Sequence, residues 1–202
     1  MKSIVITGID GSGKTTHAQL IEHLIPGSKI MSVWDIVTNP AFRDWSIYKF
    51  PPPVEKYVVN LNPTSRTLFI FHAFDFAYQR AVNSDVSLLI FDSYWYKYLA
   101  VELAMGTDPS LVDFIKNRYL EPDMSFYLDL SPTKLIERKR QISLYESGNP
   151  EHYDYDNFVR IQKKSKNYLE NFLPKNTIWL DADDPVKENH QTILENIKKG
   201  LF

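Results

Sequence analysis

A short glycine-rich stretch near the start of the sequence combines the residue types that hold phosphate. It reads GIDGSGKTT over residues 8–16 and follows the apolar run SIVIT. Its glycines let successive backbone N–H groups point at phosphate oxygens, the lysine adds charge at the outer phosphates, and the first threonine is placed to ligate Mg²⁺. The motif therefore predicts a phosphate site made of Gly8, Asp10, Gly11, Ser12, Gly13, Lys14, Thr15 and Thr16.

A second candidate is the carboxylate that ends the apolar run at 88–91. Ligands gather beyond the carboxyl ends of strands in a parallel sheet, so Asp92 is expected near the phosphate loop. There it can hold Mg²⁺, directly or through water, or orient the group that attacks the phosphate. The alternative is that Asp92 caps the helix that follows.

A basic segment, KLIERKR at 134–140, offers a third chemical element. Lys134 and Arg138 are spaced to share one helical face, and Arg140 follows two residues later. An arginine that arrives on closure can stabilise the negative charge of a transferring phosphoryl group. The polar stretch 143–155 suits a lid that opens and closes. The alternative for each basic residue is a solvated helix face.

The apolar pattern indicates which elements position these groups. Strand-like runs lie at 3–7, 28–33, 87–91, 124–130 and 176–180, and helical patterns lie at 14–25, 63–83, 94–105, 109–119, 132–142, 155–172 and 186–200. This alternation predicts an α/β fold with a parallel sheet. The segment 34–62 is the least regular, and its KFPPPVEK stretch favours an extended surface excursion over a helix.

Composition narrows the class of ligand. The chain has 202 residues and 44% hydrophobic content, enough for one core and one domain. A net charge of −2 gives no electrostatic reason to expect a nucleic-acid polymer or a membrane surface as partner, and no stretch approaches the ~20 apolar residues of a membrane span. We therefore expect a cytoplasmic protein that binds a small ligand.

In order and spacing these motifs resemble the thymidylate kinase family of P-loop nucleoside monophosphate kinases. The resemblance adds LFIFHAFDF, EPDMSFYLDLSP and LDADDPV to the motifs above, and it spans nearly the whole chain. It implies a P-loop kinase fold, with a doubly wound five-stranded parallel sheet, helices on both faces and a small lid at about 141–157 in a single domain, 1–202. It also implies ATP as donor, Mg²⁺ as cofactor, a pyrimidine nucleotide as acceptor and a homodimer.

The resemblance also assigns roles to individual residues. It implies an adenine pocket near 181–186, which includes Ala182, and a contact from Asp10 to the acceptor sugar. Gly11 stands where some members of the family carry an arginine, so the catalytic arginine is expected from the lid, as Arg138 or Arg140. The implied acceptor contacts are Asp10, Phe71, Asp75, Ser93 and Tyr153.

Several arginines of the family are missing at these positions. Ser93 follows Asp92 where an arginine is usual, and Asp75 stands four residues after Phe71 where another is expected. The lid motif expected as Arg-Tyr-Glu reads His-Tyr-Asp at 152–154, and SVWDIVTNP after the second strand lacks a further phosphate-binding arginine. The candidates to supply a cation from new positions are Arg43, Lys49, Arg66 and Arg80.

Three functions follow in order of preference. The first is ATP-dependent phosphorylation of dTMP or a related pyrimidine nucleotide. The second is a P-loop kinase whose acceptor is a nucleoside, a modified pyrimidine nucleotide or another small alcohol. The third is a nucleotide-binding protein without turnover, which the intact Lys14, Thr15 and Asp92 disfavour. Because a carboxylate at Asp75 accepts hydrogen bonds but donates none, we expect dTMP to be a poorer substrate here than for ordinary members of the family.

Overall fold

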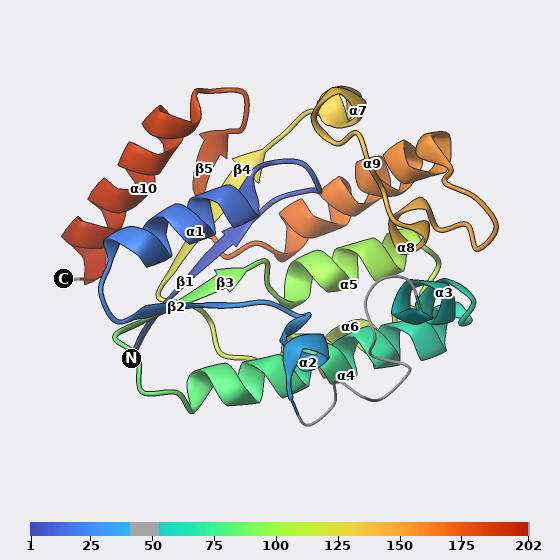
Figure 1. Ribbon diagram of the computed structural model, residues 1–202, viewed down its shortest axis with the longest axis horizontal. Coiled ribbons are helices and arrows are strands. Elements are labelled where there is room, and N and C mark those ends of the chain that lie inside the picture. The colour runs from blue at the N-terminus through green and yellow to red at the C-terminus, as the bar shows by residue number, and fades with distance from the viewer. Residues whose placement is uncertain (41–52, 202) are drawn as a thin grey trace.

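The computed structural model describes residues 1–40 and 53–201, and a five-stranded sheet forms its centre (Figure 1). The strands are β1 (Lys2–Thr7), β2 (Ser28–Met31), β3 (Leu88–Asp92), β4 (Met124–Asp129) and β5 (Ile178–Asp181), in the spatial order β2–β3–β1–β4–β5. Every pairing is parallel, which confirms the predicted sheet. The carboxyl ends of β1 and β3 therefore meet at one edge, where ligands of such sheets bind.

Helices cover both faces of this sheet (Figure 1). On one face lie α1 (Lys14–Leu24) and α10 (Val186–Leu201), and on the other lie α4 (Pro63–Val82) and α5 (Trp95–Ala104), with α9 (Tyr155–Phe172) packed along α5. Successive residues of β1 face opposite layers, since Ile4 and Ile6 join the core under α1 and α10 whereas Val5 joins the core under α4 and α5. Strands covered on both faces need the continuous apolar runs that the sequence shows. Within the described residues, no helix has the length and apolar character needed to cross a membrane.

Local signals explain why the two longest helices start where the sequence predicts. The Asn62 side chain accepts a hydrogen bond from the backbone N–H of Ser65 at 2.9 Å, and Pro63 occupies the first turn, where its missing N–H is not needed. In the same way, the Asp154 side chain accepts from the N–H of Asn157 at 2.8 Å and begins α9. Both caps satisfy backbone donors that the helix itself leaves unpaired.

The helix predicted over 132–142 is wrong in its second half. The structure has a 3₁₀ turn at Pro132–Lys134 and a short helix, α7 (Leu135–Arg138), after which Lys139 turns away with φ −118° and ψ 88°. Lys139 still donates its N–H to the carbonyl of Leu135 at 2.7 Å, so the helix ends at a satisfied bond. The chain then crosses toward the phosphate loop instead of continuing as a helix.

A second short helix, α8 (Leu144–Ser147), forms inside the predicted lid. It begins with a reciprocal cap, in which the Ser143 side chain accepts from the N–H of Glu146 and the Glu146 side chain accepts from the N–H of Ser143. It ends at Gly148, whose φ of 62° lies in the left-handed region that glycine favours. The polar stretch that suggested a loop therefore contains one ordered helical turn.

Part of the segment predicted to be irregular is also helical. Within residues 34–62, short helices form as α2 (Asp35–Thr38) and α3 (Pro53–Val59). Elsewhere, α6 (Leu111–Lys116) is shorter than the helix predicted at 109–119. Proline is tolerated in the first turn of a helix, so Pro53 can begin α3, and Val54 and Val58 are buried one turn apart. The proline-rich stretch thus leads into a helix at its end, and residues 49–52 of that stretch lie outside the described residues.

Candidate active site

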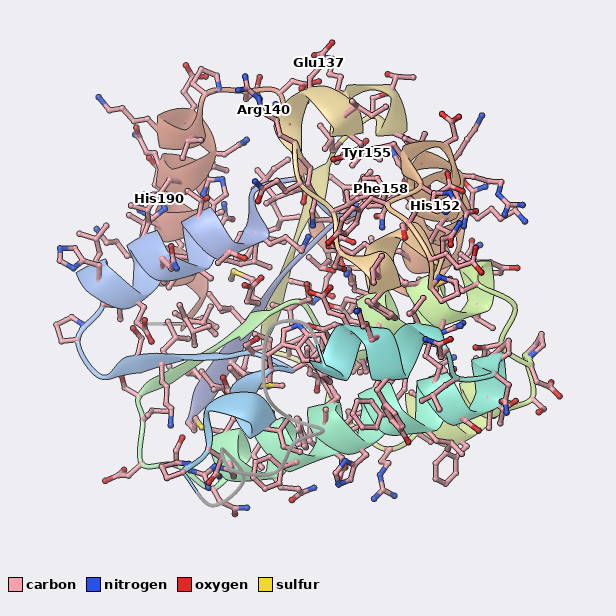
Figure 2. The ribbon with its side chains drawn as sticks, turned by 45° about the vertical axis from the view of Figure 1, so that its right-hand side comes forward. Glu137, Arg140, His152, Tyr155, Phe158 and His190 are labelled. Atoms are coloured by element: carbon pink, nitrogen blue, oxygen red, sulfur yellow. The ribbon has the colours of Figure 1, made fainter. Side chains whose placement is uncertain are left out.

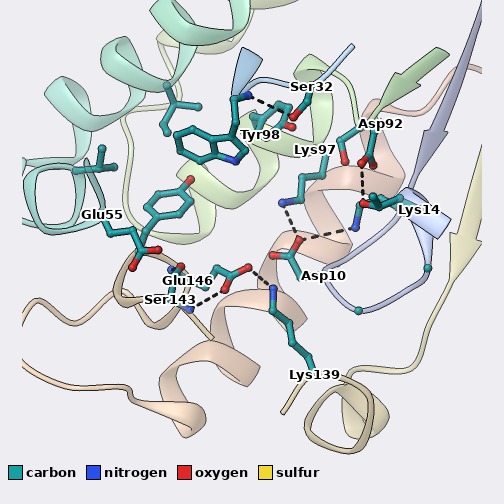
Figure 3. Close-up of a pocket in the computed structure, with 18 of the residues that line it drawn as sticks. Asp10, Lys14, Ser32, Glu55, Asp92, Lys97, Tyr98, Lys139, Ser143 and Glu146 are labelled. Atoms are coloured by element: carbon teal, nitrogen blue, oxygen red, sulfur yellow. Dashed lines mark hydrogen bonds and ion pairs between the residues drawn. The ribbon is translucent and has the colours of Figure 1, made fainter. Parts of the chain in front are cut away.

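A cavity of about 560 Å³ opens at the carboxyl ends of β1 and β3 (Figure 3). The phosphate loop and the start of α1 form one side of it, and residues of α3, α4 and α5 form the opposite side. The segment 138–146, which runs from the last residue of α7 into α8, closes a third side. The cavity is therefore lined by all three features that the sequence indicates separately: the phosphate loop, the carboxylate at the end of β3 and the basic segment 134–140.

The phosphate loop needs its glycines for space and for backbone conformation. A Cβ at Gly8 would lie 2.6 Å from the carbonyl oxygen of Leu128, which leaves no room for a side chain. Gly13 is left-handed, with φ 98°, at the point where α1 begins. Residues 14–16 follow on the cavity wall. Ser12 is buried behind them, and its hydroxyl has no hydrogen-bond partner among the described residues.

Asp10 lies at the centre of a buried cluster of polar groups (Figure 3). Its Oδ1 is 2.9 Å from Lys97 Nζ and 3.7 Å from Lys14 Nζ. Its Oδ2 accepts from the side chain of Gln162 at 2.8 Å, and its own N–H donates to the same side chain at 3.0 Å. Lys14 also donates to the carbonyl of Ile9 at 2.8 Å. Two ammonium groups thus share one carboxylate, which the glutamine holds in place.

These neighbours shift the protonation of the cluster. Burial raises the pKa of Asp10, but the ammonium groups of Lys97, Lys14 and Lys139 outweigh burial and hold that pKa well below its usual range. Burial lowers the pKa of Lys14 to about 8, an effect that Asp10 opposes and Lys97 strengthens. Asp10 is therefore ionised at neutral pH, and Lys14 loses its proton about one pH unit above neutral pH.

The Thr15 hydroxyl donates to Asp92 Oδ2 at 2.6 Å, so the two predicted Mg²⁺ ligands meet. Mg²⁺ prefers oxygen ligands and keeps water and phosphate in much of its coordination shell, so one hydroxyl and one carboxylate fit this ion. No cluster of three or more acidic, histidine or cysteine side chains suited to a metal occurs in residues 1–40 and 53–201. Capping does not explain Asp92, because α5 starts after Tyr94 and has no side-chain cap.

Within the basic segment 134–140, Lys139 lines the cavity, and its ammonium group pairs with Glu146 (Figure 3). Arg138 also lines the cavity, but its Nη2 donates to Asp183 at 2.8 Å in the turn after β5. A Cβ at Gly11 would lie 3.7 Å from Lys139 Cβ and 3.9 Å from Arg138 Cβ. The chain at residues 138–139 therefore passes directly over Gly11 of the phosphate loop.

The structure does not bring every predicted lid residue to the cavity. Arg140 is exposed at the outer edge of the molecule (Figure 2), and its carbonyl accepts from the Tyr155 hydroxyl at 2.7 Å. Tyr153 is also exposed and does not line the cavity. Both expectations need correction, because the chain turns after α7 and carries these side chains outward.

The far end of the cavity has an apolar and aromatic wall with few polar groups. Its apolar and aromatic residues are Trp34, Val54, Val58, Ile70, Tyr98 and Tyr145. Ser32 and Glu55 add a hydroxyl and a carboxylate to the same end. Burial raises the pKa of Glu55, and a hydrogen bond from the backbone of Leu144 opposes the shift. A flat apolar wall with sparse polar groups suits a nucleobase.

The structure places neither Phe71 nor Asp75 at the cavity, so the expectation that they contact the acceptor is wrong. Phe71 is buried in the core beside Tyr119, and Asp75 pairs with Arg118 at 3.3 Å away from the cavity. Each residue turns an α-helix by about 100°, so the preceding Ile70 faces the cavity instead. An aromatic-rich helix offers several faces that look alike in sequence.

Of two further predicted residues, Ser93 lies at the cavity and Ala182 lies in the core. Ser93 lines the cavity and is buried, with φ 72°, which is unusual for a residue with a Cβ. Ala182 belongs to the core under α10, and its N–H donates to the carbonyl of Asp129 at 2.9 Å. Its structural role is to fix the turn after β5, while the polar residues of that turn face outward.

Lys97 is the cavity cation that sequence reasoning missed. Of the suggested substitutes, Arg66 is buried against Glu102, and Arg80 lies over the Phe76 ring on the outer side of α4. Arg43 and Lys49 lie outside the described residues. One signal for Lys97 is present in the sequence, because a lysine in the first turn of a helix opposes the positive end of the helix dipole and calls for a local reason.

A buried network supports the wall of the cavity. Glu102 is fully buried, and its carboxylate accepts from Arg66 Nε at 2.9 Å and from the Thr67 hydroxyl at 3.1 Å. It also accepts from the Tyr145 hydroxyl at 2.7 Å. Burial, together with the Glu102 carboxylate, raises the pKa of Tyr145 well above its usual value. The network ties the lid helix α8 to α4 and α5.

Comparison of the sequence with known proteins gives full-length relatives. The chain is 27% identical to probable thymidylate kinase 1 of Saccharolobus solfataricus, over 100% of this chain and 99% of that protein. It is 28% identical to a thymidylate kinase of Leptospira interrogans, over 96% of this chain and 95% of that protein. No protein-family model matches the chain. The similarity is therefore distant but spans both proteins.

Comparison of the structure with solved structures finds kinases that have a similar fold. The thymidylate kinase of Candida albicans has a TM-score of 0.74 at 18% identity, covering 98% of this chain and 91% of that one. The deoxyadenosine kinase of M. mycoides with bound dATP has a TM-score of 0.65 at 19% identity, covering 98% and 100%. At these identities the two structures show the fold alone. With this fold, an intact phosphate loop and thymidylate kinases aligned over nearly its whole length, the chain is a divergent member of the thymidylate kinase family.

Proposed function

We propose that this protein transfers the terminal phosphoryl group of ATP to a pyrimidine nucleoside monophosphate, with dTMP as the first acceptor expected. The observation that carries this proposal is the single cavity in which the phosphate loop, the Thr15–Asp92 pair and an aromatic wall face one another. The loop suits the donor phosphates and the wall suits a base. The names of the full-length relatives favour dTMP.

The donor is proposed to lie along the phosphate loop, with its adenine beside the turn at 181–186. Lys14 exchanges its bond to the Ile9 carbonyl for the outer phosphates of ATP, which are stronger acceptors. Thr15 and Asp92 would hold Mg²⁺ together with the phosphates, and the bound ion would neutralise negative charge on the transferring group. Arg138, fixed by Asp183, stands between the loop and the adenine turn.

Residues 141–157 are proposed to act as the lid, with Lys139 as the cation that reaches the transferring group. Replacing Lys139 with alanine is expected to lower kcat by about 10²-fold with little change in the KM for ATP, because the charge is needed mainly in the transition state. Steady-state kinetics measure both constants. Arg140→Ala is the matched control, since that side chain is exposed outside the cavity. A larger loss of kcat in Arg140→Ala than in Lys139→Ala would contradict this assignment.

An acceptor screen tests the proposed function. ATP consumption is measured with dTMP, dUMP, dCMP, their ribose forms and the parent nucleosides, and we expect the highest kcat/KM with a pyrimidine monophosphate. Asp75→Ala is a specificity control, because Asp75 pairs with Arg118 away from the cavity and is expected to leave the acceptor order unchanged. A changed acceptor order in this variant would return Asp75 to the binding site.

One observation favours a second acceptor class. Arg138 carries the only guanidinium group among the described residues that line the cavity, and it lies on the donor side, held by Asp183. An acceptor without a phosphate, such as a nucleoside, would need no such group. Higher kcat/KM for a nucleoside than for its monophosphate in the same screen would establish this second class.

A further inference from the structure

We propose that Lys97 binds the phosphate of the acceptor, in place of the arginine that Ser93 replaces. This inference rests on the proposed function and narrows it, because it assigns the acceptor a phosphate group rather than a free hydroxyl. It concerns one side chain on α5 that belongs to none of the motifs of the phosphate loop, the strand end or the lid.

The position of Lys97 follows from the direction of helical side chains. Lys97 is the third residue of α5, and side chains in a helix lean back toward its N-terminus. The ammonium group is therefore carried back toward the carboxyl end of β3, where Asp92 and Ser93 lie (Figure 3). Only 12% of the Lys97 side chain is exposed, so its charge is confined to the cavity.

Ser93 cannot provide the missing charge. Its hydroxyl is neutral, its side chain is buried, and its backbone N–H is held by the carbonyl of Ile6 at 3.0 Å. Lys97 lies on the same side of the cavity, with its Nζ 5.3 Å from the centre of the Tyr98 ring.

The ion pairing of Lys97 leaves capacity for an anion. Its Nζ lies within ion-pair distance of Asp10 alone among the described residues, and Asp10 also faces Lys14. An ammonium group has three donors, so a single shared oxygen does not satisfy it. Lys139, across the cavity, has its own partner in Glu146. The under-compensated charge is therefore at Lys97 and Lys14, between the donor loop and the aromatic wall.

The arrangement separates the tasks of the two lysines. Lys14 belongs to the loop that holds the donor phosphates, whereas Lys97 lies on the acceptor side, next to the Tyr98 ring. A lysine binds phosphate as a compact point charge and does not need the planar geometry of an arginine. A monophosphate whose base lies on the aromatic wall would reach Lys97 with its phosphate and place that phosphate toward the loop.

The test compares Lys97→Met and Lys97→Arg with Lys116→Met, an exposed lysine on α6. Binding of dTMP and of ATP is measured separately by titration calorimetry, and thermal unfolding verifies the fold of each variant. Lys97→Met is expected to weaken dTMP binding roughly 10- to 100-fold, as for the loss of one charged hydrogen bond. It is expected to leave thymidine and ATP binding nearly unchanged, while Lys97→Arg retains most of the dTMP affinity and Lys116→Met all of it.

The outcomes separate this inference from the proposed function. Equal loss of dTMP, thymidine and ATP binding in Lys97→Met would make Lys97 a structural partner of Asp10 and overturn the inference. Unchanged dTMP binding in Lys97→Met, or a wild-type protein that binds no pyrimidine monophosphate, would also overturn it. Wild-type binding of dTMP that depends on Lys97, without any turnover, would instead refute the proposed function and leave the inference standing.

Discussion

Replacing Lys14 with alanine is expected to abolish phosphoryl transfer, with kcat falling by about 10³-fold or more. Lys14 is the loop cation proposed to hold the outer phosphates, and its charge acts on the transferring group from a buried position in the cavity wall. Removing it takes away stabilisation of the transition state and leaves the apolar cores untouched. Single-turnover kinetics with dTMP and ATP measure the loss directly.

The fold is expected to survive this substitution. Lys14 is buried, and burial already lowers its pKa to about 8, which means that the charged form is disfavoured there. The melting temperature of Lys14→Ala is therefore expected to equal or exceed that of the wild-type protein. Turnover near the wild-type rate in a correctly folded Lys14→Ala protein would refute the assignment of the phosphate loop.

The same group gives ATP binding a defined pH dependence. Burial is the main cause that lowers the pKa of Lys14 to about 8, and bound phosphate favours the charged form and raises that pKa. Above pH 8 the free protein must therefore take up a proton to bind ATP, and its affinity falls as pH rises. We expect about a tenfold loss for each pH unit. Calorimetry in two buffers of different ionisation enthalpy measures the proton uptake, and Lys14→Met removes it.

The residues that the structure places where the sequence predicts them are those whose position is encoded by neighbouring residues. The loop at 8–16 carries its strand, its glycines and its helix start within one short stretch, so its local conformation follows from local sterics. Asp92 is located by the end of an apolar strand and by the rule that parallel strands present their carboxyl ends at one edge. Neither inference required knowledge of a distant contact.

The parts that were missed depend on contacts between distant segments. Lys97 belongs to the site through its ion pair with Asp10, and Tyr145 belongs to it through its hydrogen bond to Glu102. In both pairs the partner comes from a distant part of the sequence. The pattern FIFHAFDF places aromatic residues on several helical faces, so composition did not decide between Ile70 and Phe71. A single step along a helix moves a side chain by about 100°, which is enough to exchange the core for the cavity.

The segment 132–142, which leads into the predicted lid, shows a different limit of prediction from sequence. Apolar and charged residues at 132–142 fit a helical repeat, yet the helix stops at Arg138. The stop is coupled to the reciprocal cap between Ser143 and Glu146, because Glu146 also holds Lys139 over the loop. The period of the sequence indicates that a helix can form, but it does not show the pairing of Lys139 with Glu146, seven residues further along the chain, where the helix ends.

Replacing Glu102 with alanine is expected to have the largest effect on stability. The carboxylate is fully buried and pairs with Arg66 at 2.9 Å, so its removal leaves a guanidinium charge inside the protein without its partner. Breaking a buried pair in this way costs about 3–5 kcal/mol of the free energy of unfolding. Urea denaturation followed by circular dichroism measures the change.

Matched variants separate the charge from the hydrogen bonds around it. Tyr145→Phe removes one hydrogen bond to the same carboxylate and is expected to cost about 1.5–3 kcal/mol, less than Glu102→Ala. The double replacement Arg66→Met with Glu102→Leu removes both charges and is expected to regain much of the loss.

Tyr145 also lines the cavity on the lid helix, so Tyr145→Phe and Glu102→Ala are both expected to raise the KM for the acceptor. A free energy of unfolding within about 1 kcal/mol of wild type for Glu102→Ala would show that water or a rearranged lid compensates the Arg66 charge. In that case the network would not be what fixes α8 against α4 and α5.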